Sequence, residues 1–146
     1  MKIVVLFLLF TIAFSYDCSK AVEYATKYCD HYNPEYHNYA RQGGDCANFV
    51  SQCLKAGGLD LSTCSGVDDK GSVYGITNLK SCLRKLGWKS SSSRPKSFKA
   101  GYPVFLKSRL HAMIASYVSD REVRICAHTN NRCNIQFNKD LIYFYL

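Results

Sequence analysis

No two of the eight cysteines stand in Cys-x-x-Cys spacing, which argues against a structural zinc site. After residue 15, no stretch is apolar enough to span a membrane. The chain has no Asn-x-Ser/Thr glycosylation signal, no basic-aromatic motif typical of nucleic-acid-binding modules, no internal repeat and no linker between domains. These absences favour one domain that binds neither nucleic acid nor a structural metal ion.

Acidic residues are few compared with basic ones: 11 Asp and Glu against 19 Lys and Arg leave a formal net charge of +8. The cations are spread along the chain, except for a basic, serine-rich run at 89–99 that predicts an exposed loop. A solvated surface accounts for this charge. Attraction to an anionic partner such as a bacterial wall is the functional interpretation.

The first residues have the pattern of a secretion signal. Lys2 precedes an apolar run at 3–14 that is too short to span a bilayer comfortably, so a membrane anchor is the weaker interpretation. Ser15 is a small residue of the kind that a signal peptidase reads at its cleavage position. We predict a signal peptide at 1–15, a single mature domain at 16–146, and secretion to the extracellular space.

Export agrees with the abundance of cysteine, because disulfides persist in oxidising compartments. If Cys46 is a free nucleophile, at least one further cysteine is unpaired, and Cys53 is the candidate because it lies on the same predicted helix face. Cys126 and Cys133 flank one polar loop, and we expect them to pair. The other four have no partners that the sequence alone assigns. They are Cys18, Cys29, Cys64 and Cys82.

Cys46 has the sequence context of a catalytic thiol. Two glycines at 43–44 give a flexible turn, and Asp45 is a favourable helix N-cap. The apolar spacing that follows predicts a helix from Cys46, which ends at Gly57–Gly58. Cys46 therefore falls in the first helical turn, where unpaired backbone N–H groups and the helix dipole favour a thiolate.

The order of the remaining elements predicts an α+β fold. Apolar residues at helical spacing indicate further helices at 18–30 and 77–86. A tyrosine-rich loop at 31–42 and an irregular segment at 59–75 separate them. The final third changes to the two-residue period of an antiparallel sheet. The expected strands are 103–106, 112–118, 123–127, 133–137 and 141–146.

Two of these strands form a hairpin that carries histidines. Residues 111–118 and 123–128 are joined by a four-residue turn. We expect Val118 to pair with Val123. In an antiparallel ladder the residue numbers of every further pair then add up to the same total. Side chains alternate between the two faces, so a register slip by one residue would turn a whole set of them to the other side.

This register predicts a catalytic group on one sheet face. His111 would lie opposite Asn130, with His128 as a diagonal neighbour. His111 could take the proton of the Cys46 thiol, and His128 or Asn130 could orient its ring. The Cys46 backbone N–H could help to hold the oxyanion. The non-catalytic alternatives are a disulfide for Cys46, an edge-strand histidine hydrogen-bonded to a loop for His111, and a surface position in a polar turn for His128.

Several motifs resemble one family of cysteine hydrolases. They are NPEY at 33–36, GDCANFVSQCL at 44–54, AGG at 56–58, HAMI at 111–114 and AHTNNR at 127–132. Together they resemble the amidase-domain family, which belongs with the NlpC/P60-like, papain-fold cysteine hydrolases. The resemblance implies that fold, with N-terminal helices packed on a C-terminal antiparallel sheet.

The resemblance also implies roles for individual residues. Cys46 corresponds to the nucleophile, His111 to the base, and His128 to the third polar residue, in preference to Asn130. Tyrosines upstream of the nucleophile often assist in related enzymes, which makes Tyr36 a candidate for oxyanion or substrate contacts, with Tyr32 and Tyr39 as rivals. Asp45, beside the nucleophile, is a second candidate for such contacts.

We therefore predict a monomeric, secreted cysteine amidase or peptidase that acts on bacterial peptidoglycan peptides through an acyl-enzyme on Cys46. It needs no metal ion and no organic cofactor. The alternative is a non-catalytic binding or toxin-like module on the same fold, with all eight cysteines bridged. A third possibility is an acyltransferase that uses the same thiolate chemistry.

Overall fold

The computed structural model describes residues 15–138 and 140–146, so the predicted signal peptide lies almost wholly outside the described residues. The described chain has the expected α+β composition, with three helices and one six-stranded antiparallel sheet. The helices are α1 (Cys18–Tyr28), α2 (Cys46–Ala56) and α3 (Ile76–Lys85). The strands are β1 (Lys89–Ser91), β2 (Pro103–Leu106), β3 (Ala112–Val118), β4 (Val123–Ala127), β5 (Arg132–Gln136) and β6 (Leu141–Tyr145).

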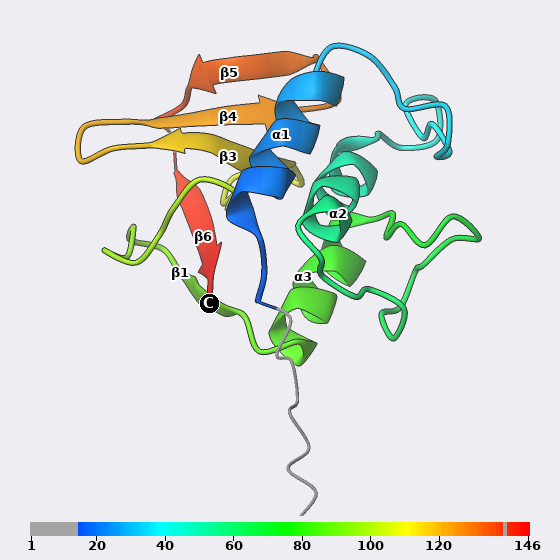
Figure 1. Ribbon diagram of the computed structural model, residues 1–146, viewed down its shortest axis with the longest axis horizontal. Coiled ribbons are helices and arrows are strands. Elements are labelled where there is room, and N and C mark those ends of the chain that lie inside the picture. Colours follow the sequence, from blue (N-terminus) through cyan, green and yellow to red (C-terminus); the bar gives the residue numbers. More distant parts are fainter. Residues whose placement is uncertain (1–14, 139) are drawn as a thin grey trace, which may run out of the picture.

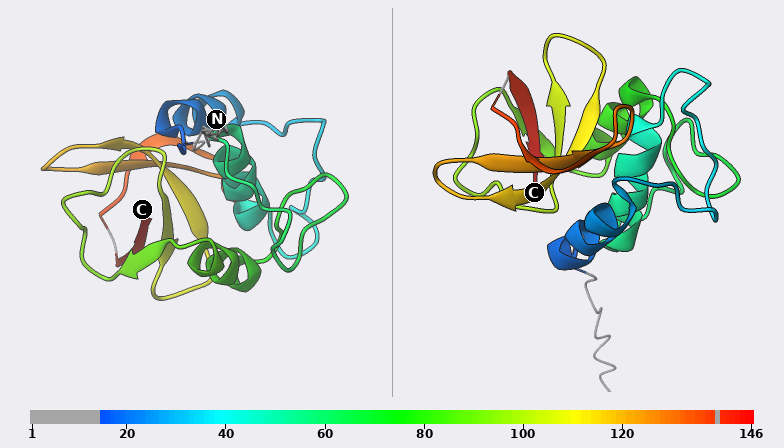
Figure 2. Two further views of the ribbon diagram at one scale, coloured as in Figure 1. Left: turned by 60° about the horizontal axis from the view of Figure 1, so that its bottom comes forward. Right: turned by 90° about the horizontal axis from the view of Figure 1, so that it is seen from above.

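The helices pack on one face of the sheet, whose strand order is β1-β6-β2-β3-β4-β5 (Figures 1 and 2). Both α1 and α2 pack against β3, while α3 lies against α2 and β1. Helix α2 is buried along nine of its eleven residues, because α1, α3 and the sheet surround it. Burial of a side chain such as Phe49 or Leu54 contributes roughly 1.5–3 kcal/mol each, so the packing of α2 anchors the start of this helix firmly.

The sequence prediction missed strand β1. Residues 89–99 were expected to form an exposed loop, but Lys89–Ser91 pairs with Tyr143–Tyr145 of β6 at the edge of the sheet. Lysine and serine give no local strand signal, and the partner lies more than 50 residues further along the chain. A short, basic edge strand of this kind also discourages pairing with another sheet.

Two disulfides join segments distant in sequence, Cys29 with Cys133 and Cys64 with Cys82. The expected Cys126–Cys133 pair is therefore wrong: Cys126 lies buried, and its sulfur accepts the Asn134 N–H at 3.3 Å. Cys133 is instead bonded to Cys29, the residue that follows α1. In the described chain Cys18, Cys46, Cys53 and Cys126 are unpaired, which confirms the prediction for Cys53.

Peptide mapping without reduction tests these pairings, because trypsin cuts after Arg132 and separates Cys126 from Cys133. We expect the peptide at 28–41, which holds Cys29, to be linked to the peptide at 133–139. The peptides at 56–70 and 81–84 should also be linked. A linked pair of 125–132 with 133–139 would contradict the structure.

No helix in the described part of the chain combines the length and the apolar character that a membrane crossing requires.

Candidate active site

Cys46 opens helix α2 at the position that the sequence predicted. Gly43 and Gly44 have φ values of 100° and 107°, which only glycine adopts readily, and they turn the chain into the helix. Cys46 is 7% exposed, and the backbone N–H groups of Ala112 and Ala47 lie close enough to its sulfur to lower the pKa of the thiol. The nucleophile candidate is thus reduced and held against the start of β3.

The thiol is not activated in the way the sequence suggested. Burial raises the pKa of Cys46 above its ordinary value of 9.0, although the N–H groups of Ala112, Ala47 and Cys46 itself lower it in part. Loss of solvent disfavours the thiolate more than the helix start favours it. At neutral pH the resting side chain is therefore a thiol, and its ionisation requires a base.

His111 is the residue just before β3, next to the Ala112 amide that contacts the thiol. Its carbonyl accepts the Leu106 N–H at 3.1 Å, and the residue is 9% exposed. Burial lowers the pKa of His111 below its ordinary value of 6.5, and the positive charges of Arg109 and Arg132 lower it further. The ring is therefore neutral at neutral pH, which is the form that accepts a proton.

Among the described residues, no hydrogen bond joins the Cys46 sulfur to the His111 ring. Catalytic hydrogen bonds of free enzymes are often long and tighten when substrate binds. The Ala112 N–H lies beside the neutral Cys46 thiol, and His111, with its neutral imidazole, is the residue just before Ala112 in the chain.

The β3–β4 hairpin has the expected register at its turn and a different one at the candidate site. Val118 pairs with Val123 as predicted. Between Ala115 and Tyr117 the register shifts by one residue, and beyond the shift Ile114 pairs with Cys126. An extra residue in one strand of a pair is a β-bulge.

The bulge overturns the predicted arrangement of the histidines. The predicted diagonal relation between His111 and His128 required the register at the turn to continue along the strands, and it does not. Asn130 is likewise not opposite His111. It is exposed in the turn after β4 and has φ 67°.

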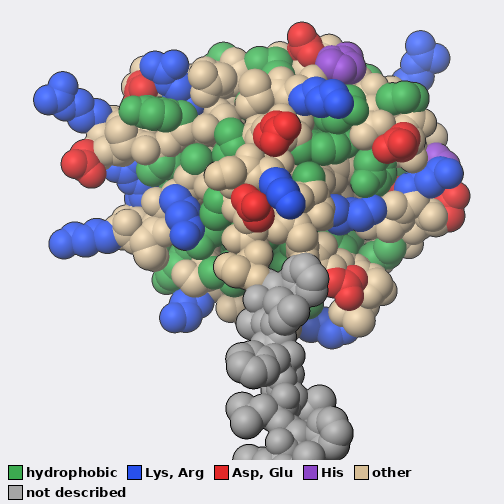
Figure 3. All heavy atoms as spheres, viewed as in Figure 1, with side chains coloured by type: hydrophobic (Ala, Val, Ile, Leu, Met, Phe, Trp, Pro, Cys, Tyr) green, Lys and Arg blue, Asp and Glu red, His purple; other side chains and the backbone are tan. Residues whose placement is uncertain are grey.

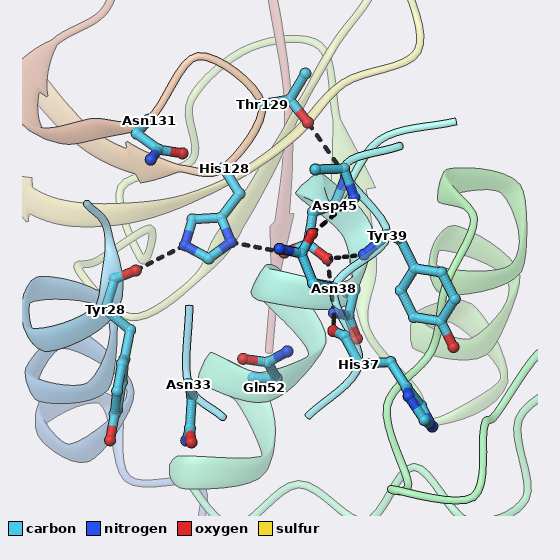
Figure 4. Close-up of polar contacts among 12 residues, drawn as sticks. Tyr28, Asn33, His37, Asn38, Tyr39, Asp45, Gln52, His128, Thr129 and Asn131 are labelled. Atoms are coloured by element: carbon cyan, nitrogen blue, oxygen red, sulfur yellow. Dashed lines mark hydrogen bonds and ion pairs between the residues drawn. The ribbon is translucent and has the colours of Figure 1, made fainter. Parts of the chain in front are cut away.

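His128 lies under helix α2 instead, where its ring stacks on Phe49 at 4.0 Å between centroids. The residue is 1% exposed, and both ring nitrogens are bonded (Figure 4). Nδ1 lies 2.6 Å from Asp45 Oδ2, and Nε2 donates to the Tyr28 carbonyl oxygen at 2.6 Å. Neither nitrogen is left to orient His111.

Asp45 is the centre of this buried network, which we call the Asp45–His128 clamp. Its Oδ1 accepts the Tyr39 N–H at 2.8 Å and the Asn48 side-chain amide at 2.9 Å, while its own N–H donates to Thr129 Oγ1 at 3.2 Å. The side chain makes no N-cap hydrogen bond, contrary to the sequence prediction. The clamp joins α1, the tyrosine loop, the start of α2 and the turn after β4.

The candidate oxyanion groups are not gathered around the thiol. The Asp45 carboxylate is fully buried within the clamp. Tyr36 lies under the Lys55 ammonium group, 4.8 Å from its ring centroid, so it faces the last turn of α2 while Cys46 opens the first. Tyr32 packs on the His128 ring at 4.6 Å, and the Tyr39 hydroxyl donates to Asp68 at 2.9 Å.

A cavity of about 800 Å³ was not anticipated from the sequence. Arg109 and Arg132 line it, and both act electrostatically on His111. The spacing of these two arginines in the sequence carries no recognisable motif. Arg109 could have been noticed from the sequence only because it stands two residues before His111, the predicted base.

No good metal site occurs among the described residues. The side chains of Cys29, Asp30 and Cys133 come close together, but the two sulfurs are bonded to each other. A single exposed carboxylate is then left, and one carboxylate does not hold a metal ion by itself.

The fold and the site define an α+β protein with a reduced cysteine, Cys46, at the start of a buried helix. The Ala112 N–H lies beside its sulfur, and His111 directly precedes Ala112. The chain belongs to the family described as "Putative amidase domain", whose model matches residues 15–105. That description indicates an amidase-like hydrolase. The match includes Cys46 and the whole of α2, and it ends before His111.

A similar protein is the Bacillus subtilis (strain 168) "Uncharacterized protein YhbB", which is 49% identical over 49 residues. The aligned part is 34% of this chain and 15% of YhbB, so the chain spans a small fraction of that relative. No solved structure matches the chain.

Proposed function

We propose that this protein is a secreted cysteine amidase of the NlpC/P60-like, papain-fold type, which cuts amide bonds in bacterial peptidoglycan peptides. One observation carries the proposal: Cys46 is reduced, opens a buried helix, and contacts the backbone beside His111, in a chain of an amidase family. The two disulfides agree with an oxidising compartment.

The reaction begins with the transfer of a proton from the Cys46 thiol to the neutral His111 ring as the sulfur attacks the amide carbonyl carbon. A C–S bond forms, and the resulting oxyanion is held by the Cys46 backbone N–H. Collapse of this intermediate breaks the C–N bond, and His111 returns the proton to the departing amine. His111 then takes a proton from water, which attacks the acyl-enzyme, breaks the C–S bond and leaves the thiol protonated again.

We assign His128 to positioning and not to the third catalytic place. Its contacts favour this role, because one ring nitrogen bonds Asp45, the residue before Cys46, and the other bonds the Tyr28 carbonyl oxygen, so neither is free for His111. Among the described residues, Asn130, the other candidate, makes no hydrogen bond to His111, and it is exposed in the turn after β4.

The choice of peptidoglycan rests on charge. The chain carries a formal net charge of +8, and in Figure 3 the Lys and Arg side chains project from many parts of the visible face. Bacterial walls are anionic, so a basic enzyme is drawn to them at physiological ionic strength. Incubation of the purified protein with walls from several bacteria, followed by mass analysis of the fragments, tests the assignment. New peptide fragments with free amines are expected; intact wall peptides would contradict it.

The pH profile tests the roles of Cys46 and His111. Because the pKa of His111 is lowered, kcat/KM should decline with acid only below pH 6.5, where the base becomes protonated. Arg109→Gln removes one of the two cations that lower this pKa, so its acid limb should move to higher pH on an uncharged substrate. Arg121→Gln, a charge change in the remote β3–β4 turn, should leave the limb unchanged.

Alkylation of the free enzyme supplies a second pH readout. Because burial raises the pKa of Cys46, its reaction with iodoacetamide should still be accelerating above pH 9.0. A plateau below pH 8 would show a preformed thiolate, and an acid limb of kcat/KM above pH 6.5 would contradict the role of His111.

A further inference from the structure

The end of helix α1 is fastened to the β4–β5 turn (residues 128–131) in two ways. The Cys29–Cys133 disulfide is a covalent link, with 5.3 Å between its two Cα atoms. The second link is the hydrogen bond that His128 Nε2 donates to the Tyr28 carbonyl oxygen at 2.6 Å. Tyr28 and Cys29 are neighbours in the chain, so both links hold the same end of α1.

The sheet register brings the other ends of these two links together. Arg132 of β5 pairs with Ala127 of β4. His128 directly follows Ala127, and Cys133 directly follows Arg132, so both lie at the base of the same turn. The disulfide therefore restrains the gap across which the His128 hydrogen bond forms.

This hydrogen bond leads to the proposed nucleophile. The His128 ring also pairs with Asp45 at 2.6 Å, and Asp45 is the residue before Cys46 (Figure 4). A single ring thus connects the end of α1, which the disulfide holds, to the start of α2. Movement of the α1 end should therefore displace the Cys46 thiol.

The two disulfides of the described chain differ in exposure and in what they join. Cys133 is exposed, whereas Cys64 is half-buried and Cys82 is buried. A thiolate must reach a sulfur to attack it, so the Cys29–Cys133 bond is the more open to reduction. The Cys64–Cys82 bond joins the irregular segment at 59–75 to α3, and neither residue is next in sequence to a member of the Asp45–His128 clamp.

We propose that the Cys29–Cys133 disulfide is a redox switch of the active site: the oxidised bond holds Cys46 in place for catalysis, and its reduction lowers the activity. The inference rests on the proposed function and adds its regulation. A newly made chain has low activity in a reducing compartment, and export to an oxidising compartment activates it.

The reductant is a dithiol, either dithiothreitol in the test or a thioredoxin-like protein in the cell. One of its thiolates attacks the exposed Cys133 sulfur, the bond between Cys29 and Cys133 breaks, and Cys29 leaves as a thiolate that takes up a proton. The second thiol of the reductant then attacks the mixed disulfide and releases Cys133, which is protonated in turn. Two electrons and two protons pass to the cysteines, and the dithiol becomes a disulfide.

Graded reduction of the folded wild type tests the switch. A catalytic thiol alone predicts that dithiothreitol preserves or raises the activity, because the reductant protects Cys46 from oxidation. The switch predicts the opposite: release of amine from wall peptides should fall at least about tenfold, in step with the fraction of Cys29–Cys133 bonds reduced. Alkylation and peptide mapping measure that fraction, and circular dichroism follows the folded state. Reoxidation should restore the activity.

Paired serine variants separate the switch from a general loss of stability. Cys29→Ser/Cys133→Ser should have a lowered kcat that dithiothreitol no longer changes. Cys64→Ser/Cys82→Ser removes the other disulfide, and below its Tm it should keep the wild-type kcat and the response to dithiothreitol. The proposal is overturned by unchanged activity after full reduction of Cys29–Cys133, by a loss that follows Cys64–Cys82 instead, or by a loss that occurs only as the protein unfolds.

The alkylation rate of Cys46 gives a readout that needs no turnover. At pH 8, iodoacetamide should modify Cys46 at least about fivefold faster in Cys29→Ser/Cys133→Ser than in the wild type, because a loosened start of α2 exposes the sulfur. Equal rates in the two proteins would contradict the displacement that the switch requires.

Failure of this inference is distinguishable from failure of the proposed function. Protein that shows the difference in Cys46 alkylation but cleaves no wall peptide would retain the switch and lose the hydrolase assignment. Protein that cleaves wall peptides equally well with Cys29–Cys133 oxidised and reduced would retain the hydrolase assignment and lose the switch.

Discussion

Replacement of Cys46 by serine is expected to reduce amide hydrolysis by at least about 1,000-fold, because a serine hydroxyl at this buried position is a far weaker nucleophile than a thiol that His111 can deprotonate. The change removes no large side chain, so the near-UV and far-UV circular dichroism spectra should match those of the wild type. The measurement is the rate of release of amine from a wall-peptide substrate.

Cys18→Ser is the matched control, since Cys18 is also unpaired but lies in α1 and is only half buried. It should retain full activity. Rapid acid quenching of the wild type should trap an acyl group on Cys46, seen as a mass increase on the peptide at 42–55 that fragmentation assigns to Cys46 and not to Cys53. Full turnover by Cys46→Ser, or an acyl group on another cysteine, would rule out the proposed nucleophile.

Replacement of His128 by alanine is expected to destabilise the protein more than any other single histidine change. The substitution leaves the Asp45 carboxylate buried without its partner and the Tyr28 carbonyl without a donor. Breaking one side of a buried ion pair costs about 3–5 kcal/mol of unfolding free energy, which corresponds to a fall in Tm of about 10–20 °C for a domain of this size. Thermal unfolding followed by circular dichroism measures the loss.

The effect on catalysis separates positioning from simple stability. Asp45 directly precedes Cys46, the proposed nucleophile, so a loosened clamp should displace the start of α2, and a displacement of about 1 Å can cost about 100-fold in rate. At a temperature where the variant is folded, kcat should fall while KM changes little. His128→Gln, which can still donate one hydrogen bond, should recover part of the loss.

His31→Ala is the control for this experiment. His31 also pairs with an aspartate, Asp30, but both side chains are exposed. Exposed ion pairs contribute little, so the Tm and kcat should stay near the wild-type values. If His128→Ala were as stable and as active as His31→Ala, the Asp45–His128 clamp would have no role in holding the nucleophile.

Much of the secondary structure follows from local patterns in the sequence. The helix from Cys46 was predicted from its glycine turns and apolar spacing, and the strands at Ala112–Val118 and Val123–Ala127 from their two-residue period. These signals depend on neighbours a few residues apart, so they can be read without knowledge of the rest of the chain. The unpaired state of Cys53 followed from the same periodicity, which placed it in the core.

The candidate site depended on contacts that no local pattern specifies. One extra residue in the β3–β4 ladder changes the pairing beyond the turn, and His128 stacks on Phe49 and pairs with Asp45. The position of a bulge is decided by packing across the whole sheet, because the two-residue period tolerates either register locally.

The sequence alone determined which chemical groups this protein has available: a thiol at a helix start, a histidine at a strand start, and an excess of positive charge. Only the tertiary structure decided which groups interact. Cys29 is bonded to Cys133, His128 pairs with Asp45, and the charges of Arg109 and Arg132 act on the His111 ring. The physical reason is that helix and strand formation depend on short-range periodicity. These long-range interactions depend instead on the free energy of burying the whole chain around one core.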